Sequence, residues 1–337
     1  MQFRVIKYVA SIAMILALFV VMLGAYTRLT DAGLGCPDWP GCYGHMVLPS
    51  AQNELESAQS QYPQIPIEAQ KAWTEMAHRY AAGTLGLFIL FIAGSIFWRR
   101  LRGEGLSLPW FLALTLILLV LFQAALGMWT VTLKLLPVVV MGHLLGGILI
   151  FSCLSCLWLQ LSSVSPLNLP QWRNWVLLGA VIVFCQIALG GWVSSNYAGI
   201  ACIGFPQCNG QWLPALHFSQ GFNLFSPVGA NYQGGVLDND VRMTIQYIHR
   251  LGAILTAAYV LILGSLLLTK VENKTLRLFA LLAILLIVVQ FILGVMNVLY
   301  LLPLGVAVMH NGVAALLMAT MLMMLYLTQG RFSDAQR

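Results

Sequence analysis

The chain consists of long apolar runs separated by polar segments. A helix needs about 20 predominantly apolar residues to cross the hydrocarbon core of a membrane. Eight runs meet this requirement, and they cover residues 7–28, 76–98, 108–131, 138–160, 174–195, 243–269, 275–299 and 304–327. The pattern therefore predicts an all-α integral membrane protein with eight transmembrane helices, whose termini lie on the same side of the membrane.

Composition supports this fold class. Of the 337 residues, 60% are hydrophobic and 8% are charged, whereas a soluble protein carries about 25% charged residues. The N-terminus lacks the small-residue cleavage site of a secretory signal, so we expect the first apolar run to be retained as a span. No Arg- and Ser-rich transit peptide is present, which favours a bacterial inner membrane.

The formal net charge of +6 reflects membrane orientation rather than nucleic-acid binding. The basic residues form no long run beyond 99–102. Eleven of the seventeen Lys and Arg residues fall on the terminal side of the predicted spans: Arg4, Lys7, Arg99, Arg100, Arg102, Arg173, Lys270, Lys274, Arg277, Arg331 and Arg337. By the positive-inside rule the termini are cytoplasmic, and the long polar segments 29–75 and 196–242 face the periplasm.

The two halves of the chain resemble each other at an offset of 166 to 171 residues. The sequence from Gln123 to Gly127 recurs from Gln290 to Gly294, and paired cysteines, histidines and prolines recur in the same order. A repeat of four spans keeps its topology, so the halves are predicted to be parallel repeats about an axis along the membrane normal. We expect two four-helix bundles, residues 1–165 and 166–337.

Four histidines lie near the start of the even-numbered predicted spans, on the periplasmic side. His78 and His143 belong to the first half, and His249 and His310 are their repeat counterparts. Histidine is costly inside a membrane, and two facing histidines in a helical bundle commonly hold a haem iron from both sides. We therefore predict two haem-sized sites with these side chains as axial iron ligands.

Other interpretations of the histidines stay open. Pairs across the halves satisfy the sequence as well as pairs within each half. A single membrane histidine often serves an interhelical hydrogen bond, although four repeat-related ones favour ligation. Zinc fits less well than haem, because no cluster of cysteines or carboxylates shares the depth of both pairs.

Arginines accompany the histidines. Arg79 and Arg250 each directly follow a histidine, and Arg28 ends the first span. Guanidinium groups bind carboxylates through two parallel hydrogen bonds, and haem propionates are carboxylates that would point toward the periplasmic rim. We predict that these arginines bind propionates, with Arg28 serving the first site because Ser195 replaces it in the second half. The alternative is a snorkelling side chain that anchors at the lipid headgroups.

One ionisable residue distinguishes the halves. Glu75 lies three residues before His78, on the same face of a helix, and its repeat counterpart before His249 is Gln246. A carboxylate near a haem edge relays protons or stabilises a developing cation, whereas an amide only forms hydrogen bonds. The asymmetry predicts chemistry at the first site, unless Glu75 is simply an acid favoured by the helix dipole.

Each long polar segment contains two cysteines separated by five residues. They are Cys36 and Cys42 in the first segment and Cys202 and Cys208 in the second. Disulfides persist in an oxidising compartment such as the periplasm, so we expect a structural disulfide in each loop. A redox-active pair or a transient covalent role in the first loop is the alternative.

These motifs together resemble the haem A synthase family. The segment from Thr27 to Cys42 is similar to the family's first external loop. The segments 75–79 and 246–250 resemble its two His-Arg motifs, and His143 and His310 match its remaining histidines. The resemblance covers essentially the whole chain.

The resemblance implies an activity. Haem A synthases convert haem O to haem A by oxidising a ring methyl group to a formyl group through successive hydroxylations, and haem A goes to terminal oxidases. The family's haem b cofactor maps to His249 and His310, its substrate haem maps to His78 and His143, and its functional acid maps to Glu75. Its loop cysteines map to the four cysteines above, which some members lack.

The resemblance also implies partners. These are haem O, membrane lipid, an electron donor, and contacts with haem O synthase and cytochrome oxidase assembly factors, with a homo-oligomer left open. Two other function classes stay open on the sequence. One is a di-haem electron carrier similar to a cytochrome b, and the other is a haem transporter or chaperone.

Overall fold

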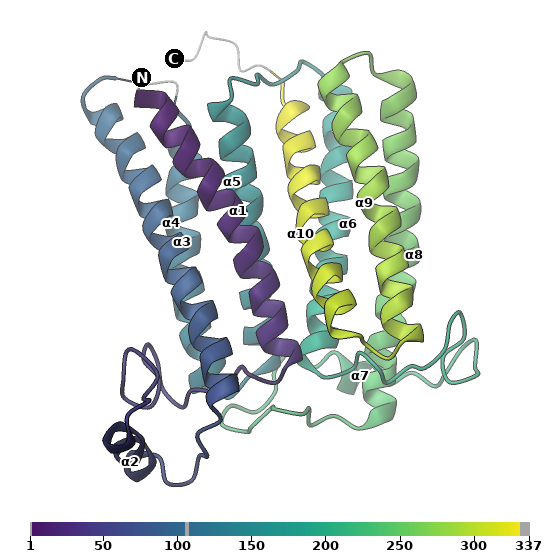
Figure 1. Ribbon diagram of the computed structural model, residues 1–337. Coiled ribbons are helices and arrows are strands. Elements are labelled where there is room, and N and C mark those ends of the chain that lie inside the picture. Colours follow the sequence, from purple (N-terminus) through teal and green to yellow (C-terminus); the bar gives the residue numbers. More distant parts are fainter. Residues whose placement is uncertain (1, 105–107, 331–337) are drawn as a thin grey trace.

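The computed structural model describes residues 2–104 and 108–330, and the described chain is helical, without a named strand (Figure 1). Its helices are α1 (Gln2–Leu29), α2 (Gln52–Gln61), α3 (Ala69–Leu101), α4 (Trp110–Thr132), α5 (Pro137–Leu161), α6 (Pro170–Ser195), α7 (Phe218–Gly221), α8 (Asn239–Lys270), α9 (Lys274–Leu299) and α10 (Leu304–Leu327). All of these except the short α2 and α7 are long and apolar enough to cross a membrane. The prediction of eight spans is therefore confirmed.

Four spans begin four or more residues earlier than the hydropathy pattern predicts, among them α1 at Gln2 and α6 at Pro170. Helix α3 begins at Ala69 and α8 at Asn239, which is seven and four residues before the predicted starts. The first turns of both helices carry polar and charged side chains, so hydropathy alone excludes them. The longer α3 places Glu75, which lies one residue before the predicted span, within regular helix.

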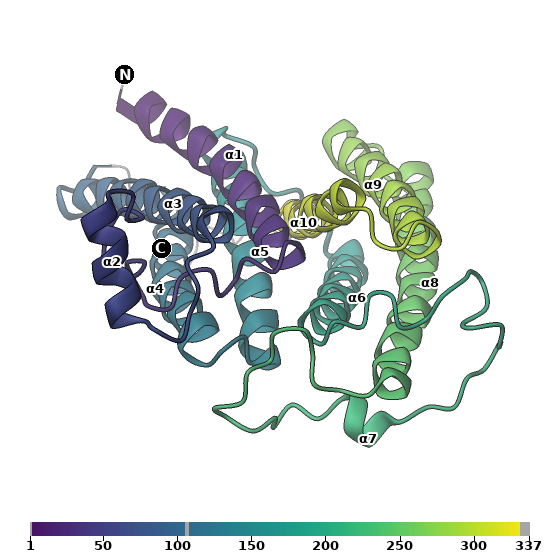
Figure 2. The same cartoon turned by 60° about the horizontal axis from the view of Figure 1, so that its bottom comes forward.

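The spanning helices contact one another in the same order in each half of the chain. In the first half the contacts run from α1 to α3, α4, α5 and back to α1. In the second half they run from α6 to α8, α9, α10 and back to α6. The two groups meet through α1, α5, α6 and α10 (Figures 1 and 2). This order is what a parallel repeat of four spans requires, and the duplication itself stays a prediction.

Small side chains allow α1 to pack closely against three neighbours. Ala10, Ala13 and Ala17 are fully buried along one face of this helix, which contacts α3, α5 and α10. Without a hydrophobic driving force inside lipid, helices associate through such close packing. The buried core at the end of the bundle nearer the termini is continuous, and it supports the more open loop end.

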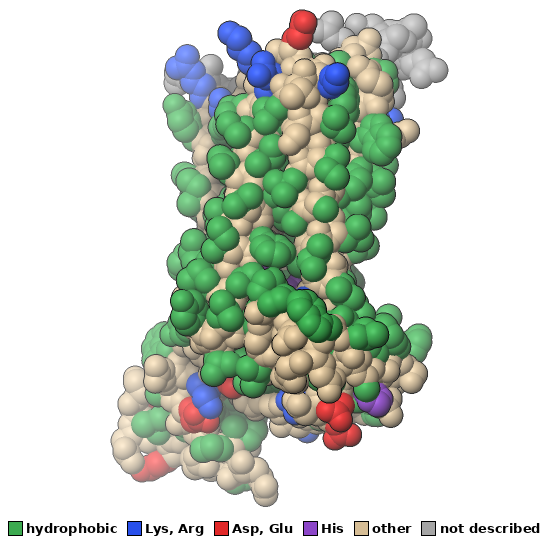
Figure 3. Space-filling view, turned by 90° about the vertical axis from the view of Figure 1, so that its right-hand side faces the viewer, with side chains coloured by type: hydrophobic (Ala, Val, Ile, Leu, Met, Phe, Trp, Pro, Cys, Tyr) green, Lys and Arg blue, Asp and Glu red, His purple; other side chains and the backbone are tan. Residues whose placement is uncertain are grey.

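The outer surface of the bundle is apolar. Large side chains such as Phe19, Leu118 and Leu285 are more than half exposed. Figure 3 shows that the middle of one face of the bundle is largely apolar, while charged side chains lie at its two ends. The protein is a multi-pass membrane protein whose apolar belt matches lipid. Arg331 and Arg337, which entered the charge count, lie outside the described residues.

Candidate functional site

One cavity of about 1030 Å³ lies among the spans toward the loop end of the bundle. All eight spans contribute to its wall, and His78, His143, His249 and His310 all line it. Ligand pockets in proteins measure about 300–1,000 Å³, so this cavity is large enough for a cofactor-sized ligand. Both histidine pairs open into the same space.

The structure brings His78 of α3 and His143 of α5 together. Their ring centres are 6.4 Å apart, and their ring planes are nearly perpendicular, at 88°. Two imidazoles that bind one metal ion from opposite sides, through bonds of about 2 Å, have ring centres about 6 Å apart. The Nδ1 atoms of both rings are buried without a hydrogen-bond partner. The spacing of the two rings thus matches that of two ligands of one iron atom.

The second pair has polar neighbours. The amide nitrogen of Gln186 lies 3.0 Å from Nδ1 of His249 and donates to the His249 backbone oxygen at 3.0 Å. The amide nitrogen of Gln290 lies 3.3 Å from Nε2 of His310. His249 comes from α8 and His310 from α10, which are the counterparts of α3 and α5 in the contact order of the halves.

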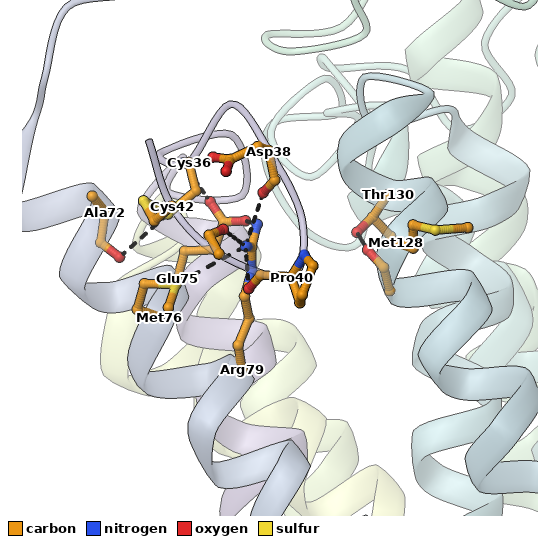
Figure 4. Close-up of polar contacts among 12 residues, drawn as sticks. Cys36, Asp38, Pro40, Cys42, Ala72, Glu75, Met76, Arg79, Met128 and Thr130 are labelled. Carbon is orange, nitrogen blue, oxygen red and sulfur yellow. Dashed lines mark hydrogen bonds and ion pairs between the residues drawn. A yellow bond between two sulfur atoms is a disulfide. The ribbon is translucent and has the colours of Figure 1, made fainter. Parts of the chain in front are cut away.

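Glu75 is a buried carboxylate with two strong partners, and only 4% of its surface is exposed. One carboxylate oxygen accepts a hydrogen bond from the backbone N–H of Cys36 at 2.9 Å, and the other forms an ion pair with Arg79. These contacts are drawn in Figure 4. They hold the carboxylate at the wall of the cavity, three residues before His78 on the same helix.

Arg79 attaches the first loop to the bundle. Besides Glu75, its guanidinium donates to the backbone oxygens of Asp38 at 2.9 Å, Pro40 at 3.2 Å and Gly41 (Figure 4). This loop is closed by the predicted disulfide between Cys36 and Cys42, which the structure contains. These contacts use many of the N–H donors of Arg79. The sequence analysis predicts that the same donors bind a haem propionate.

Arg250 attaches the second loop in the same way, but without a carboxylate. It donates to the backbone oxygens of Gly204 at 2.8 Å, Gln207 at 3.3 Å and Cys202. The predicted disulfide between Cys202 and Cys208 closes this loop. Gln246 occupies the slot of Glu75, is 6% exposed, and leaves its side-chain oxygen buried without a partner.

Arg28 lies at the junction of the two halves. Its guanidinium donates to the backbone oxygen of Ser194 at 2.5 Å and stacks 3.8 Å from the ring centre of Tyr197. Burial raises the pKa of the Tyr197 phenol, so its hydroxyl stays protonated and donates to Asp31 at 3.0 Å. Arg28 therefore joins the first half to the second, while it also lines the cavity.

Comparison with known proteins identifies the family. The sequence model described as Cytochrome oxidase assembly protein (COX15-CtaA) matches residues 7–322. A Heme A synthase of Shewanella oneidensis is 44% identical over 98% of this chain and 99% of its own length. A Heme A synthase of Allorhizobium ampelinum is 31% identical over 90% of this chain and 85% of its own length. The chain belongs to the COX15-CtaA family. The family resemblance predicted from the motifs is confirmed.

The structure of this COX15-CtaA protein shows a glycine beside each histidine, which sequence reasoning missed. A β-carbon added to Gly24 would lie 3.0 Å from the His78 ring, and the corresponding distance from Gly190 to the His249 ring is 3.1 Å. Gly127 faces His143 at 3.4 Å, and Gly294 faces His310 at 3.2 Å. The signal that could have found them is a Leu-Gly pair in each odd-numbered span: Leu23-Gly24, Leu126-Gly127, Leu189-Gly190 and Leu293-Gly294.

Arg242 is a second residue that sequence reasoning left without a role. It lines the cavity seven residues before His249, on the same face of α8, and its Nε atom is buried without a partner. Its repeat counterpart is Lys71, which pairs with Glu68 at 2.8 Å instead. Residues separated by four and three positions lie on one face of a helix. The sequence therefore already predicts that Arg242, Gln246 and His249 share a face.

Proposed function

We propose that this COX15-CtaA protein converts haem O to haem A for the assembly of cytochrome oxidase. In this reaction a ring methyl group is oxidised to a formyl group through successive hydroxylations. The observation that carries the proposal is the His78–His143 pair, whose rings are spaced for one iron, beside a buried carboxylate in a cavity with a second histidine pair. Its relatives named Heme A synthase support the same activity.

The first half, residues 1–165, forms the substrate site in this proposal. His78 and His143 would hold the iron of haem O, and an iron porphyrin would supply the redox chemistry by which an external oxidant acts on the methyl group. Glu75 is fixed by Arg79 and the Cys36 N–H, so its carboxylate cannot turn away from the cavity. From this position it takes up a proton or stabilises positive charge that develops at the methyl carbon.

The second half, residues 166–337, holds haem b between His249 and His310. The amide of Gln246 provides no ionisable group where Glu75 stands in the first half, so we assign this site an electron-transfer role. Both histidine pairs line one cavity, which favours electron transfer between the two sites.

Arginines at the loop end of the cavity bind the propionates in this proposal. Arg28, Arg242 and Arg250 line the cavity, and each keeps a buried Nε–H without a partner. A buried donor without a partner is costly, and a carboxylate oxygen would satisfy it. Arg79 contributes through the loop that it holds over the first site.

We also propose a bacterial inner-membrane location with cytoplasmic termini and periplasmic loops. Both disulfide loops lie at the end of the bundle opposite the termini (Figure 1), and disulfides persist in the periplasm. A C-terminal alkaline phosphatase fusion should be inactive and a C-terminal fluorescent protein fusion should be bright. The proposed partners are membrane lipid, an electron donor, haem O synthase and cytochrome oxidase assembly factors.

The activity is tested in a host that makes haem O but no haem A. The protein is expressed there, and the haems of the membrane and of the purified protein are extracted and identified. We expect haem A with the wild-type chain and none with Glu75→Ala. Haem b alone at both sites would contradict the proposal and favour an electron carrier, and transfer of unmodified haem O would favour a transporter.

A further inference from the structure

A glutamine stands one turn before the histidine-facing glycine in three of the four odd-numbered spans. These glutamines are Gln123, Gln186 and Gln290, and the fourth position, in α1, is Val20. Position 20 is the repeat counterpart of position 186, at the same offset of 166 that relates Gly24 to Gly190. The two halves therefore differ at the helix face that packs against His78 and His249.

The glutamines make different contacts. Gln186 reaches the ring of His249, at 3.0 Å from Nδ1. Gln123 reaches only the backbone oxygen of His143, at 2.9 Å. Nδ1 of His78 is buried without a hydrogen-bond partner. Of the four cavity histidines, His249 is the one whose Nδ1 has a side-chain partner among the described residues.

A partner at Nδ1 matters for a histidine that binds metal through Nε2. Such a ring carries its proton on Nδ1, and an acceptor for that proton fixes the tautomer and the orientation of the ring. In the structure the amide nitrogen of Gln186 faces the ring, and its oxygen is buried without a partner. A half-turn of the terminal amide brings that oxygen to Nδ1, where it accepts the ring proton and leaves Nε2 free for iron. The same turn gives up the hydrogen bond from the amide nitrogen to the His249 backbone oxygen, so iron binding at Nε2 has to offset that loss.

The fold leaves room for this amide by means of a glycine. A β-carbon added to Gly252, three residues after His249, would lie 2.3 Å from the Gln186 side-chain oxygen. The repeat counterpart of Gly252 is Ala81. The first half therefore lacks both the amide and the glycine that accommodates it.

We propose that Gln186 is a positioning residue that makes the haem at His249 a resident cofactor. Val20 and Ala81 leave His78 without this support, so the haem at the first site exchanges as a substrate and product must. The inference rests on the proposed function, because it needs haem at both sites. It adds a physical reason why haem stays bound longer at His249 than at His78.

The test is haem transfer from the purified holoprotein to excess apomyoglobin, followed by absorbance and by extraction of the remaining haem. We expect Gln186→Leu to release haem b about 10- to 100-fold faster than wild type, the usual effect of removing such a partner. Gln186→Glu keeps an acceptor and should restore slow release. Gly252→Ala displaces the amide without removing it and should also speed release. The low-spin signal of the haem b iron in electron paramagnetic resonance should change in both fast-releasing variants.

Gln123→Leu is the matched control, because the same truncation there removes only a contact with backbone. Its haem release should equal that of the wild type. The reciprocal variant Val20→Gln/Ala81→Gly should slow release from the first site. Release of haem b from Gln186→Leu at the Gln123→Leu rate would overturn the inference and leave the proposed function standing. A wild-type protein that binds no haem at His249 and His310 would overturn both.

Discussion

The two histidine pairs share a scaffold and differ in the residues around it. In both halves a histidine ring packs against a glycine, and an arginine one residue later binds the backbone of a disulfide loop. The first half adds a buried carboxylate, Glu75, and lacks an amide at Nδ1 of His78. The second half replaces the carboxylate with Gln246 and supplies Gln186.

This comparison separates binding from chemistry. The features that are repeated are those needed to hold a planar, iron-containing ligand between helices. The features that are not repeated are an ionisable group and a hydrogen bond that fixes a ring. The difference supports our proposal that the first site turns over substrate and that the second holds a permanent cofactor.

The largest expected effect comes from replacing the carboxylate of Glu75 with the amide that the second half has at Gln246. Glu75→Gln keeps the size of the side chain and removes its charge. We expect haem A formation to fall about 10²- to 10⁴-fold, the usual contribution of an acid–base group, while haem O still binds. Extraction of haems from the purified variant measures both. Gln246→Glu is the reciprocal control and should leave the reaction at the first site largely intact, whereas an equal loss in both variants would break the comparison.

The glycine contacts predict selective loss of haem from each half. Gly24→Val should displace the His78 ring and empty the substrate site, and Gly190→Val should displace the His249 ring and remove haem b. We expect at least a tenfold loss of haem at the affected site, comparable to loss of an outer-shell partner. Gly94→Ala is the control, because nothing lies within 4 Å of its added β-carbon. Loss of the same haem from both valine variants would contradict the assignment.

Replacing Arg79 and replacing Arg250, each in a separate variant, should destabilise the protein to different extents. Arg79→Leu leaves the buried Glu75 carboxylate unpaired, which costs about 3–5 kcal/mol. Arg250→Leu leaves only backbone oxygens without a donor, which costs about 1–3 kcal/mol. The apparent melting temperature in detergent should fall further for Arg79→Leu. Adding Glu75→Gln to Arg79→Leu should recover part of the loss, and equal melting temperatures for the two single variants would argue against the buried ion pair.

The smallest expected effect concerns the two disulfide loops. The backbone N–H of Cys36 donates to Glu75, so the first loop orients the carboxylate. Replacing Cys36 and Cys42 by Ser should lower haem A formation about tenfold, because a hydrogen bond to a charged group contributes about 1.5–3 kcal/mol. The same replacement at Cys202 and Cys208 should have a smaller effect. The two double variants are compared by haem A formation in membranes that contain equal amounts of the protein. An equal loss of activity in both would contradict this prediction.

Much of the fold could be predicted from the sequence. Apolar runs of about 20 residues identify spans because lipid leaves few alternatives to a helix. The starts of α3 and α8 could not be predicted from hydropathy, because their first turns carry polar and charged side chains. The disulfides were predictable because the polar segments that carry the paired cysteines were predicted to face an oxidising compartment, where disulfides persist.

The site was predictable as a set of residue types but not as a set of contacts. Histidines and Glu75 stand out because ionisable groups are rare in spans. The partners of Arg79 and Arg250 did not follow from the sequence, since backbone oxygens of a folded loop leave no pattern in it. The four glycines that face a histidine each follow a leucine, but other Leu-Gly pairs such as Leu178-Gly179 occur in the spans, so the packing is needed to identify them.

The most direct test of the two roles is the haem content of two double variants expressed where haem O is made. His78→Ala/His143→Ala should retain haem b and contain neither haem O nor haem A. His249→Ala/His310→Ala should lack haem b and retain haem O that is not converted. Loss of the same haem from both variants, or haem A formation by His78→Ala/His143→Ala, would contradict the account.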